Sequence, residues 1–272
     1  MEKKSQTDDA SVKSVDFQIR VRGLRKSFGE HKVLRGVDLD IERGRINVVI
    51  GGSGVGKSVL MKHLIGLLKP EGGNIFVDGE DIVRMNDFEL NRVRKKFGMM
   101  FQYAALFDSM DVEQNVMFPL VEHRRKQLTR AQMKELVKEK LESLGLFNVE
   151  KKYPAELSGG MRKRVGLARA TILEPEILFY DEPTTGLDPI AAKNVDEMIV
   201  EASDSLGVTS VVISHDMAST FRIGNRVSML YKGEIVASGT PAELLKDPHP
   251  ELNDFIETSG TMPALMGGNR SL

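Results

Sequence analysis

Short apolar runs alternate with amphipathic stretches along most of the chain. Runs rich in β-branched and other apolar residues predict strands at about 46–50, 75–78, 97–101, 177–181, 208–213, 226–231 and 234–237. Residues 17–22 alternate between apolar and polar side chains, which predicts an edge strand, and apolar residues recur at helical spacing over 57–68. This alternation of strands and helices predicts an α/β core with a largely parallel central sheet and an antiparallel β layer near the N-terminus.

Strand patterns disappear after Gln102, and helical patterns replace them up to about residue 172. Thr129 and Gln132 are spaced as the two ends of a capping box, and apolar residues follow at helical spacing, so a helix is predicted to begin there. The predicted parts are a polar mobile N-terminus (1–15), an α/β core (16–102 and 173–240), a helical subdomain (103–172) and a C-terminal helix and tail (241–272).

Composition narrows the class of protein only slightly. The chain has 272 residues with 41% hydrophobic content, enough to bury a large core. Its net charge of −1 gives no global field that favours nucleic acid as a partner, and the absence of cysteine excludes disulfides and cysteine metal sites. No apolar run approaches the roughly 18 residues of a transmembrane helix, and residues 1–10 lack a signal peptide's apolar region. We therefore expect that the chain does not cross a membrane by itself.

A glycine-rich segment between the strand at 46–50 and the helix at 57–68 follows the pattern G-x-x-x-x-G-K-[ST]. In such a loop the backbone N–H groups surround phosphates, the lysine supplies positive charge near the β- and γ-phosphates, and the serine hydroxyl can bind Mg²⁺. A glycine-rich turn without a ligand is the alternative, but a loop at a helix N-terminus favours anion binding. The residues expected to contact ATP are Gly51, Gly52, Ser53, Gly54, Val55, Gly56, Lys57, Ser58 and Val59.

Two adjacent carboxylates follow the apolar run at 177–181. Asp181 is expected to hold Mg²⁺, directly or through water, together with Ser58. Glu182 points to the other side of the strand end and can polarise the attacking water as a general base. Such a pair is common at strand ends, but after a phosphate-binding loop it indicates nucleotide hydrolysis.

Residues 20–240 resemble the nucleotide-binding subunits of ABC transporters, since Leu157-Ser158-Gly159-Gly160-Met161 looks like the signature motif of that family. The resemblance implies a P-loop NTPase fold of the ABC type, with a RecA-like parallel-sheet core, an N-terminal antiparallel β layer and an inserted helical subdomain. It also implies that Ser158, Gly159 and Gly160 contact ATP held by a second copy of the chain, in a head-to-tail dimer. A plain turn with Ser158 as helix N-cap is the alternative.

The resemblance also implies roles for residues outside the main motifs. Gln102 would lie in the glutamine loop, contacting Mg²⁺ and the reacting water, and Asp188 would contact the opposite subunit from the D-loop. His215 would be the switch histidine that binds the γ-phosphate and holds Glu182 and water in line. Phe28 would stack on adenine, although a phenylalanine in the core would produce the same pattern.

Residues 101–123, together with Met161 where most members of the family have Gln, look most like the ATPases of MCE-type lipid transport systems, the Mla group. That resemblance implies a phospholipid cargo, an integral membrane permease, an MCE-domain protein and a peripheral location at the cytoplasmic face of the inner membrane. A solute importer, such as an amino-acid system, is the alternative. An ABC ATPase that acts on nucleic acid or ribosomes, or a clamp that binds ATP without turnover, fits the motifs less well.

Several apolar residues directly after Gln102 allow two interpretations. In the first interpretation they form the core of the helical subdomain. In the second, which we favour, they form a groove for a helix of the permease. These residues are Ala104, Ala105, Leu106, Phe107, Met110, Met117 and Phe118.

Overall fold

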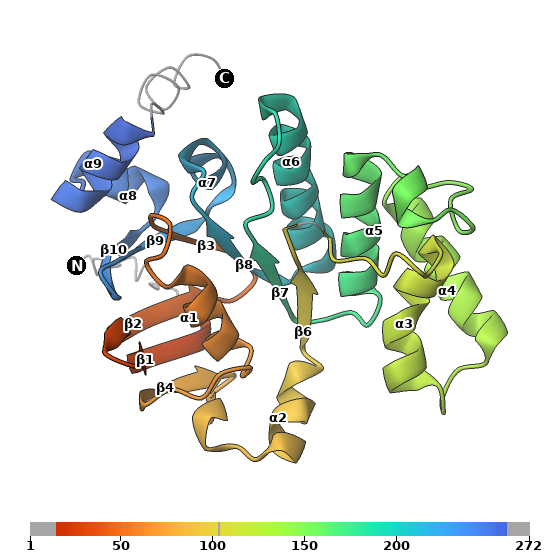
Figure 1. Ribbon diagram of the computed structural model, residues 1–272, viewed down its shortest axis with the longest axis horizontal. Helices are drawn as coiled ribbons and strands as arrows, with labels where there is room; N and C mark the ends of the chain where they lie inside the picture. Colours follow the sequence, from red (N-terminus) through yellow and green to blue (C-terminus); the bar gives the residue numbers. More distant parts are fainter. Residues whose placement is uncertain (1–14, 103, 260–272) are drawn as a thin grey trace, which may run out of the picture.

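The computed structural model describes residues 15–102 and 104–259. Within these residues the strands form two sheets. An antiparallel sheet has the order β2-β1-β4-β5, and a mixed sheet has the order β10-β9-β3-β8-β7-β6. The mixed sheet is parallel apart from its edge strand β10, which runs antiparallel to β9. The predicted architecture of a largely parallel core with an N-terminal antiparallel layer is therefore confirmed (Figure 1).

Strands and helices alternate as expected along the core. The strands are β1 (Phe17–Phe28), β2 (His31–Glu42), β3 (Ile46–Ile50), β4 (Gly72–Val77), β5 (Glu80–Asp81), β6 (Phe97–Met100), β7 (Ile177–Asp181), β8 (Thr209–Ser214), β9 (Arg226–Tyr231) and β10 (Glu234–Gly239). The helices are α1 (Lys57–Leu64), α2 (Asp87–Arg94), α3 (Val112–Arg124), α4 (Arg130–Ser143), α5 (Gly159–Thr171), α6 (Pro189–Leu206), α7 (Met217–Ile223), α8 (Pro241–Lys246) and α9 (Pro250–Thr258), with short 3₁₀ turns η1 (Ile82–Arg84) and η2 (Pro154–Glu156).

The prediction of an edge strand at 17–22 was wrong. This segment belongs to β1, which pairs with β2 on one side and with β4 on the other. Alternation of apolar and polar residues reports which face of a sheet is buried, and it carries no information about neighbours in the plane of the sheet. β2 itself was not among the strands predicted from the sequence.

Helix ends differ from the predicted ones for local reasons. The helix predicted over 57–68 ends at Leu64, and Gly66 follows with φ +70°, in the left-handed region where the chain leaves a helix. Within the predicted helical region, α5 begins at Gly159, directly after Ser158, because the Ser158 hydroxyl caps it. The capping box at Thr129 is confirmed, since its hydroxyl and the Gln132 side chain bond each other's backbone N–H.

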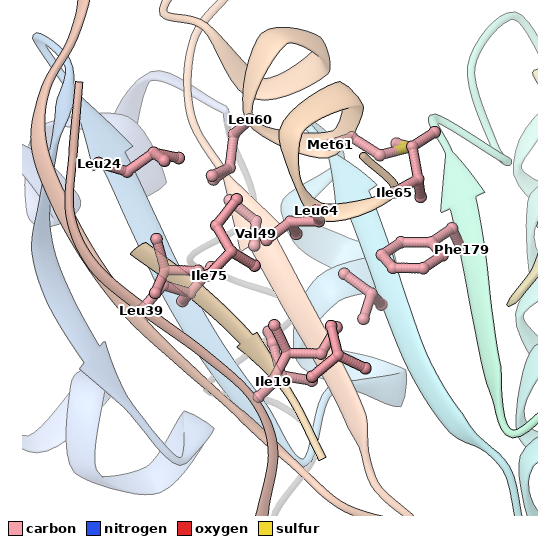
Figure 2. Packing of buried hydrophobic residues seen from close by; sticks show 14 of the residues in the cluster. Ile19, Leu24, Leu39, Val49, Leu60, Met61, Leu64, Ile65, Ile75 and Phe179 are labelled. Carbon is pink, nitrogen blue, oxygen red and sulfur yellow. The ribbon is translucent and has the colours of Figure 1, made fainter. Parts of the chain in front are cut away.

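Buried side chains on successive residues of the central strands point to opposite faces of the sheet. Val49 and Phe179 join a cluster with α1 and the antiparallel sheet (Figure 2), whereas their neighbours Val48 and Tyr180 join a second cluster with α6, α7 and α9. A third cluster lies among α3, α4 and α5, on the side of the molecule away from β1, β2 and β4 (Figure 1). Helices therefore cover both faces of the central sheet, as in other parallel sheets.

The C-terminal part of the described chain contains two short helices, α8 and α9, where a single helix was predicted. Leu252 and Ile256 of α9 are buried in the second cluster. The predicted mobile N-terminus, up to residue 14, and the tail after Ser259 lie outside the described residues. No helix in the described ranges has the length and apolar character needed to cross a membrane.

Candidate nucleotide-binding site

The strand order brings the candidate motifs to one edge of the central sheet. β3, β8 and β7 are parallel neighbours, with Ile50 paired to Ser214 and Asp181 paired to Ile213. The loop that starts at Gly51, the carboxylates after β7 and the histidine after β8 therefore all leave the sheet at the carboxyl ends of its strands. This edge is where α/β folds bind ligands.

Two glycines let the loop after β3 pass close to its neighbours. A Cβ on Gly51 would lie 2.4 Å from the carbonyl oxygen of Leu230, and a Cβ on Gly56 would lie 2.8 Å from the side chain of Val33. Gly56 also adopts φ +107° as the residue before α1. The loop therefore turns directly from β3 into the N-terminus of α1, where backbone N–H groups can bind an anion.

The remaining loop residues differ in exposure. Ser53, Gly54 and Ser58 are exposed, so their polar groups are accessible to a ligand. Val55 and Val59 are partly buried and pack against the core cluster that includes residues of α1.

Lys57 occupies a buried position at the start of α1. Its ammonium donates hydrogen bonds to the carbonyl oxygens of Gly51 at 2.7 Å and Gly52 at 3.0 Å, and it lies 3.6 Å from the Oε1 of Glu182. Burial lowers the pKa of Lys57, while the negative charges of Glu182 and Asp181 oppose that shift. The loop thus holds a positive charge directly beside the two carboxylates.

Glu182 connects the other charged groups of the site. Its Oε2 lies 3.2 Å from the Nδ1 of His215 and accepts a hydrogen bond of 3.1 Å from the Thr185 hydroxyl. Its backbone has φ +46°, which is unusual for a residue with a side chain, and its N–H donates to the carbonyl oxygen of Ile213. Strained backbone of this kind persists where surrounding contacts enforce it, and it is concentrated at functional sites.

Asp181 ends β7, and burial, followed by the neighbouring Glu182, raises the pKa of its carboxyl group. A cation at this position would relieve both effects. Among the described residues, no group of three or more His, Cys, Asp or Glu side chains could hold a metal ion. Mg²⁺ that is bound with a nucleotide takes one or two protein oxygens and fills its other positions with phosphates and waters.

Two further predicted site residues, Gln102 and Phe28, lie at or just beyond strand ends. Gln102 follows β6, the neighbour of β7 in the sheet, so it also lies at the carboxyl ends of the strands. Phe28 ends β1, and half of its surface is exposed, which excludes the alternative that it belongs to the core. The ammonium of Lys26 lies 5.3 Å from the centre of its ring. The ring is available for stacking on a ligand.

The signature segment lines a pocket of about 480 Å³. Ser158 caps α5 by accepting a hydrogen bond from the N–H of Met161 at 3.3 Å, as the alternative interpretation expected. Gly159, Gly160 and Asp188 line the same pocket, and Asp188 caps α6. No residue of the loop after β3 contributes to this lining. Within one chain the structure thus separates the signature residues from the phosphate-binding loop.

Sequence analysis missed two residues of the site. The Thr185 hydroxyl binds Glu182, and the buried ammonium of Lys163 in α5 donates to the carbonyl oxygen of Pro183. Lys163 stands four positions before the buried Leu167, so helical spacing placed it on the buried face of α5. Nothing in the sequence indicated its acceptor.

Comparison with known proteins identifies the family. Residues 34–185 match the family described as ABC transporter. The chain is 38% identical over 244 residues to the intermembrane phospholipid transport system ATP-binding protein MlaF of Escherichia coli (strain K12), covering 90% of each chain. It is 41% identical over 238 residues to the probable ribonucleotide transport ATP-binding protein mkl of Mycobacterium leprae (strain TN), covering 88% of this chain and 68% of that protein.

Solved structures agree with this assignment. The protein cbiO1 from Clostridium perfringens, part of an ABC transporter complex, has a TM-score of 0.78 and 28% identity, covering 92% of this chain and 99% of that one. The dimeric ATP-binding cassette MJ0796 in a post-hydrolysis state, bound to ADP and Pi, has a TM-score of 0.73 and 28% identity, covering 82% of this chain and 98% of that one. The chain therefore belongs to the ABC transporter family, as an ATP-hydrolysing subunit.

Proposed function

We propose that this subunit drives phospholipid transport through an integral membrane permease, at the cytoplasmic face of the inner membrane, with an MCE-domain protein as a further partner. The similarity to MlaF supports this proposal most, because it extends over 90% of both chains. Ribonucleotide transport is a second candidate, since mkl is the more identical relative, but this chain spans only about two thirds of the mycobacterial proteins. We therefore favour the lipid cargo.

A transport assay separates the two cargoes. The full chain, purified with the membrane protein that accompanies it from detergent-solubilised membranes, is reconstituted in phospholipid vesicles. We expect ATP hydrolysis to rise with phospholipid content and labelled phospholipid to be moved in an ATP-dependent manner. Stimulation by ribonucleotides, with no response to phospholipid, would replace the lipid proposal by the second candidate.

In the proposed mechanism the loop 51–58 surrounds the phosphates of ATP, and Lys57 moves its ammonium onto the β- and γ-phosphates. Glu182 accepts a proton from the attacking water, while His215 and Thr185 hold its carboxylate in place. Asp181, Ser58 and Gln102 would hold Mg²⁺, which neutralises phosphate charge when bound. The exposed ring of Phe28 stacks on adenine.

The second half of each site comes from a second copy of the chain. The backbone N–H groups at the start of α5 are exposed and lie in a pocket without the phosphate-binding loop. In a head-to-tail dimer, Ser158, Gly159 and Gly160 of one copy meet the γ-phosphate held by the other, and Asp188 lies beside them. Two composite sites result, each with a P-loop from one chain and a signature segment from its partner.

Mixed dimers test the composite arrangement. A dimer with Lys57→Ala on one chain and Ser158→Arg on the other concentrates both changes in one composite site and leaves the second site intact. We expect one ATP bound per dimer, measured by calorimetry on the purified heterodimer. Both homodimers serve as controls, and each should lack an intact composite site. Two damaged sites in the heterodimer would show that the signature segment acts on ATP of its own chain.

The apolar residues after Gln102 divide between the two interpretations. Ala104 and Met117 are buried, and Leu106 packs against the cluster among α3, α4 and α5. Phe107 and Phe118 are exposed, with ring centres 5.1 Å apart. Phe118, Met110 and Met117 also line a groove of about 670 Å³ beside α3 and α4. We propose that this groove receives a helix of the permease, because it combines exposed apolar side chains with a concave shape.

Two substitutions in this segment should behave differently. Phe118→Asp places a charge in the groove, so the variant is expected to melt like the wild type but to lose co-fractionation with its permease. Leu106→Asp buries a charge and should lower the melting temperature. Phe147→Asp, which changes an exposed aromatic residue outside the groove, is the control. Normal membrane association of Phe118→Asp would exclude the groove as the docking site.

A further inference from the structure

A buried carboxylate joins two helices, α6 and α7. α6 begins at the signature pocket, and α7 begins just after His215. Asp196 lies in α6 with only 1% of its side chain exposed. It accepts hydrogen bonds from the Ser219 hydroxyl and from the Arg222 guanidinium, both in α7. Burial raises the pKa of Asp196, and these two donors oppose the shift. The contact therefore fixes the position of α7 against α6.

The contacts of Ser219 continue from Asp196 to the residue next to His215. Asp216 caps α7 by accepting the N–H of Ser219 at 3.0 Å. The other oxygen of Asp216 accepts the Thr184 hydroxyl at 3.3 Å, which ties the start of α7 to the loop after Glu182. Ser219 thus binds Asp196 with its hydroxyl and Asp216 with its N–H.

His215 depends on this arrangement for its position. Its side chain is substantially exposed, and the Nδ1 of its ring contacts the Oε2 of Glu182. Its backbone is set by β8 on one side and by Asp216 at the start of α7 on the other. A shift of α7 relative to α6 would therefore move the imidazole relative to the Glu182 carboxylate.

The same helix α6 also lines the signature pocket. Asp188, directly before the helix, lines that pocket, and so do Val195 and Met198 further along. Asp196 stands between these two residues and is buried against α7. One rigid element thus connects the partner-facing pocket to the carboxylate that holds α7.

We propose that Asp196 is a positioning residue, which holds α7 so that His215 meets Glu182 and which couples the partner-facing end of α6 to that contact. The consequence for turnover rests on the proposed roles of His215 and Glu182. A purely structural ion pair is the competing explanation. Removal of one partner of a buried ion pair destabilises a protein whether the pair is purely structural or positions another residue, so stability alone does not decide between them.

The test compares the full-length variants Asp196→Asn and Ser219→Ala with Glu197→Gln, which changes an exposed carboxylate on the same helix that pairs with Lys193. The chain has 5 histidines, so ring-labelled histidine gives a simple NMR spectrum, and His215→Gln assigns the His215 signal. We expect the His215 signal to shift in the first two variants while the His31 signal is unchanged. We expect kcat to fall about tenfold, with the KM for ATP within about twofold of the wild type, because misplacement of a reacting group affects the chemical step.

The outcomes separate this proposal from the proposed function. A wild-type His215 signal and a wild-type kcat, with or without a lower melting temperature, would overturn the positioning role. A shifted His215 signal with normal kcat has two meanings. If His215→Gln is also fully active, the role assigned to His215 in turnover is wrong, and Asp196 still positions His215. If His215→Gln is inactive, the position that Asp196 gives to His215 does not control turnover, and the proposal fails. Should Asp196→Asn not fold, Ser219→Ala decides alone, since it keeps the charge pair of Asp196 with Arg222.

Discussion

Replacement of Glu182 by Gln is expected to lower ATP turnover by about 100-fold or more while ATP still binds. The amide keeps the volume of the carboxylate and can still bond His215 and Thr185, which lie within 3.2 Å of its oxygen. It cannot accept the proton of the attacking water. ATP should therefore accumulate in the composite sites, and the dimer should remain closed.

The measurement combines steady-state phosphate release with size-exclusion chromatography in the presence of ATP. Glu176→Gln is a suitable control, because it removes a half-exposed carboxylate before β7 without changing the nucleotide site. Turnover at the wild-type rate in the Glu182→Gln protein would exclude Glu182 as the general base. Turnover lost together with ATP binding would instead indicate that the carboxylate mainly supports the loop around Lys57.

Replacement of Lys57 by Ala is expected to remove both tight ATP binding and hydrolysis. The ammonium is the buried cation at the start of α1, and it is held by the carbonyl oxygens of Gly51 and Gly52 at the mouth of the loop. Loss of a charged hydrogen-bond donor to phosphate costs about 3 kcal/mol, on the order of 100-fold in Kd. Hydrolysis suffers further because the phosphates lose a cation that stabilises developing charge.

Isothermal titration with ATP measures the loss directly. Lys138→Ala, which removes an exposed lysine from α4, controls for the change in net charge and for helix propensity. The melting temperature of Lys57→Ala should be recorded as well, because Glu182 loses its neighbouring cation in this variant. Wild-type ATP affinity in a folded Lys57→Ala protein would contradict the assignment of the loop as the phosphate site.

Much of the fold was predictable because the relevant signals are local. The five buried residues of β3, four of them apolar, end directly at a glycine-rich loop and an amphipathic helix, so the strand, the loop and the helix N-terminus could each be identified from adjacent residues. The capping box at Thr129 is likewise complete within four residues. The pairing of β1 with both β2 and β4 was not predictable, because it depends on hydrogen bonds in the plane of the sheet between distant segments.

The nucleotide-binding site also combines features set by adjacent residues with features set by distant segments. The sequence by itself determined the chemical groups and their local setting: a phosphate-binding loop before α1, two carboxylates after β7 and a histidine after β8. Their order along the chain carried the resemblance to the ABC transporter family, which the comparisons confirmed. The local setting could be predicted because backbone geometry around a strand end or a helix start is fixed by a few neighbouring residues.

The tertiary structure decided which of these groups meet and what holds them. It brought Lys57 and His215 to opposite oxygens of Glu182, separated the exposed Phe118 from Leu106, which packs against the core, and joined α6 to α7 through Asp196. Each of these facts depends on packing between segments that are far apart in the chain. A helical or strand pattern specifies which face of an element is buried, but the partner on that face is selected only when the whole core packs.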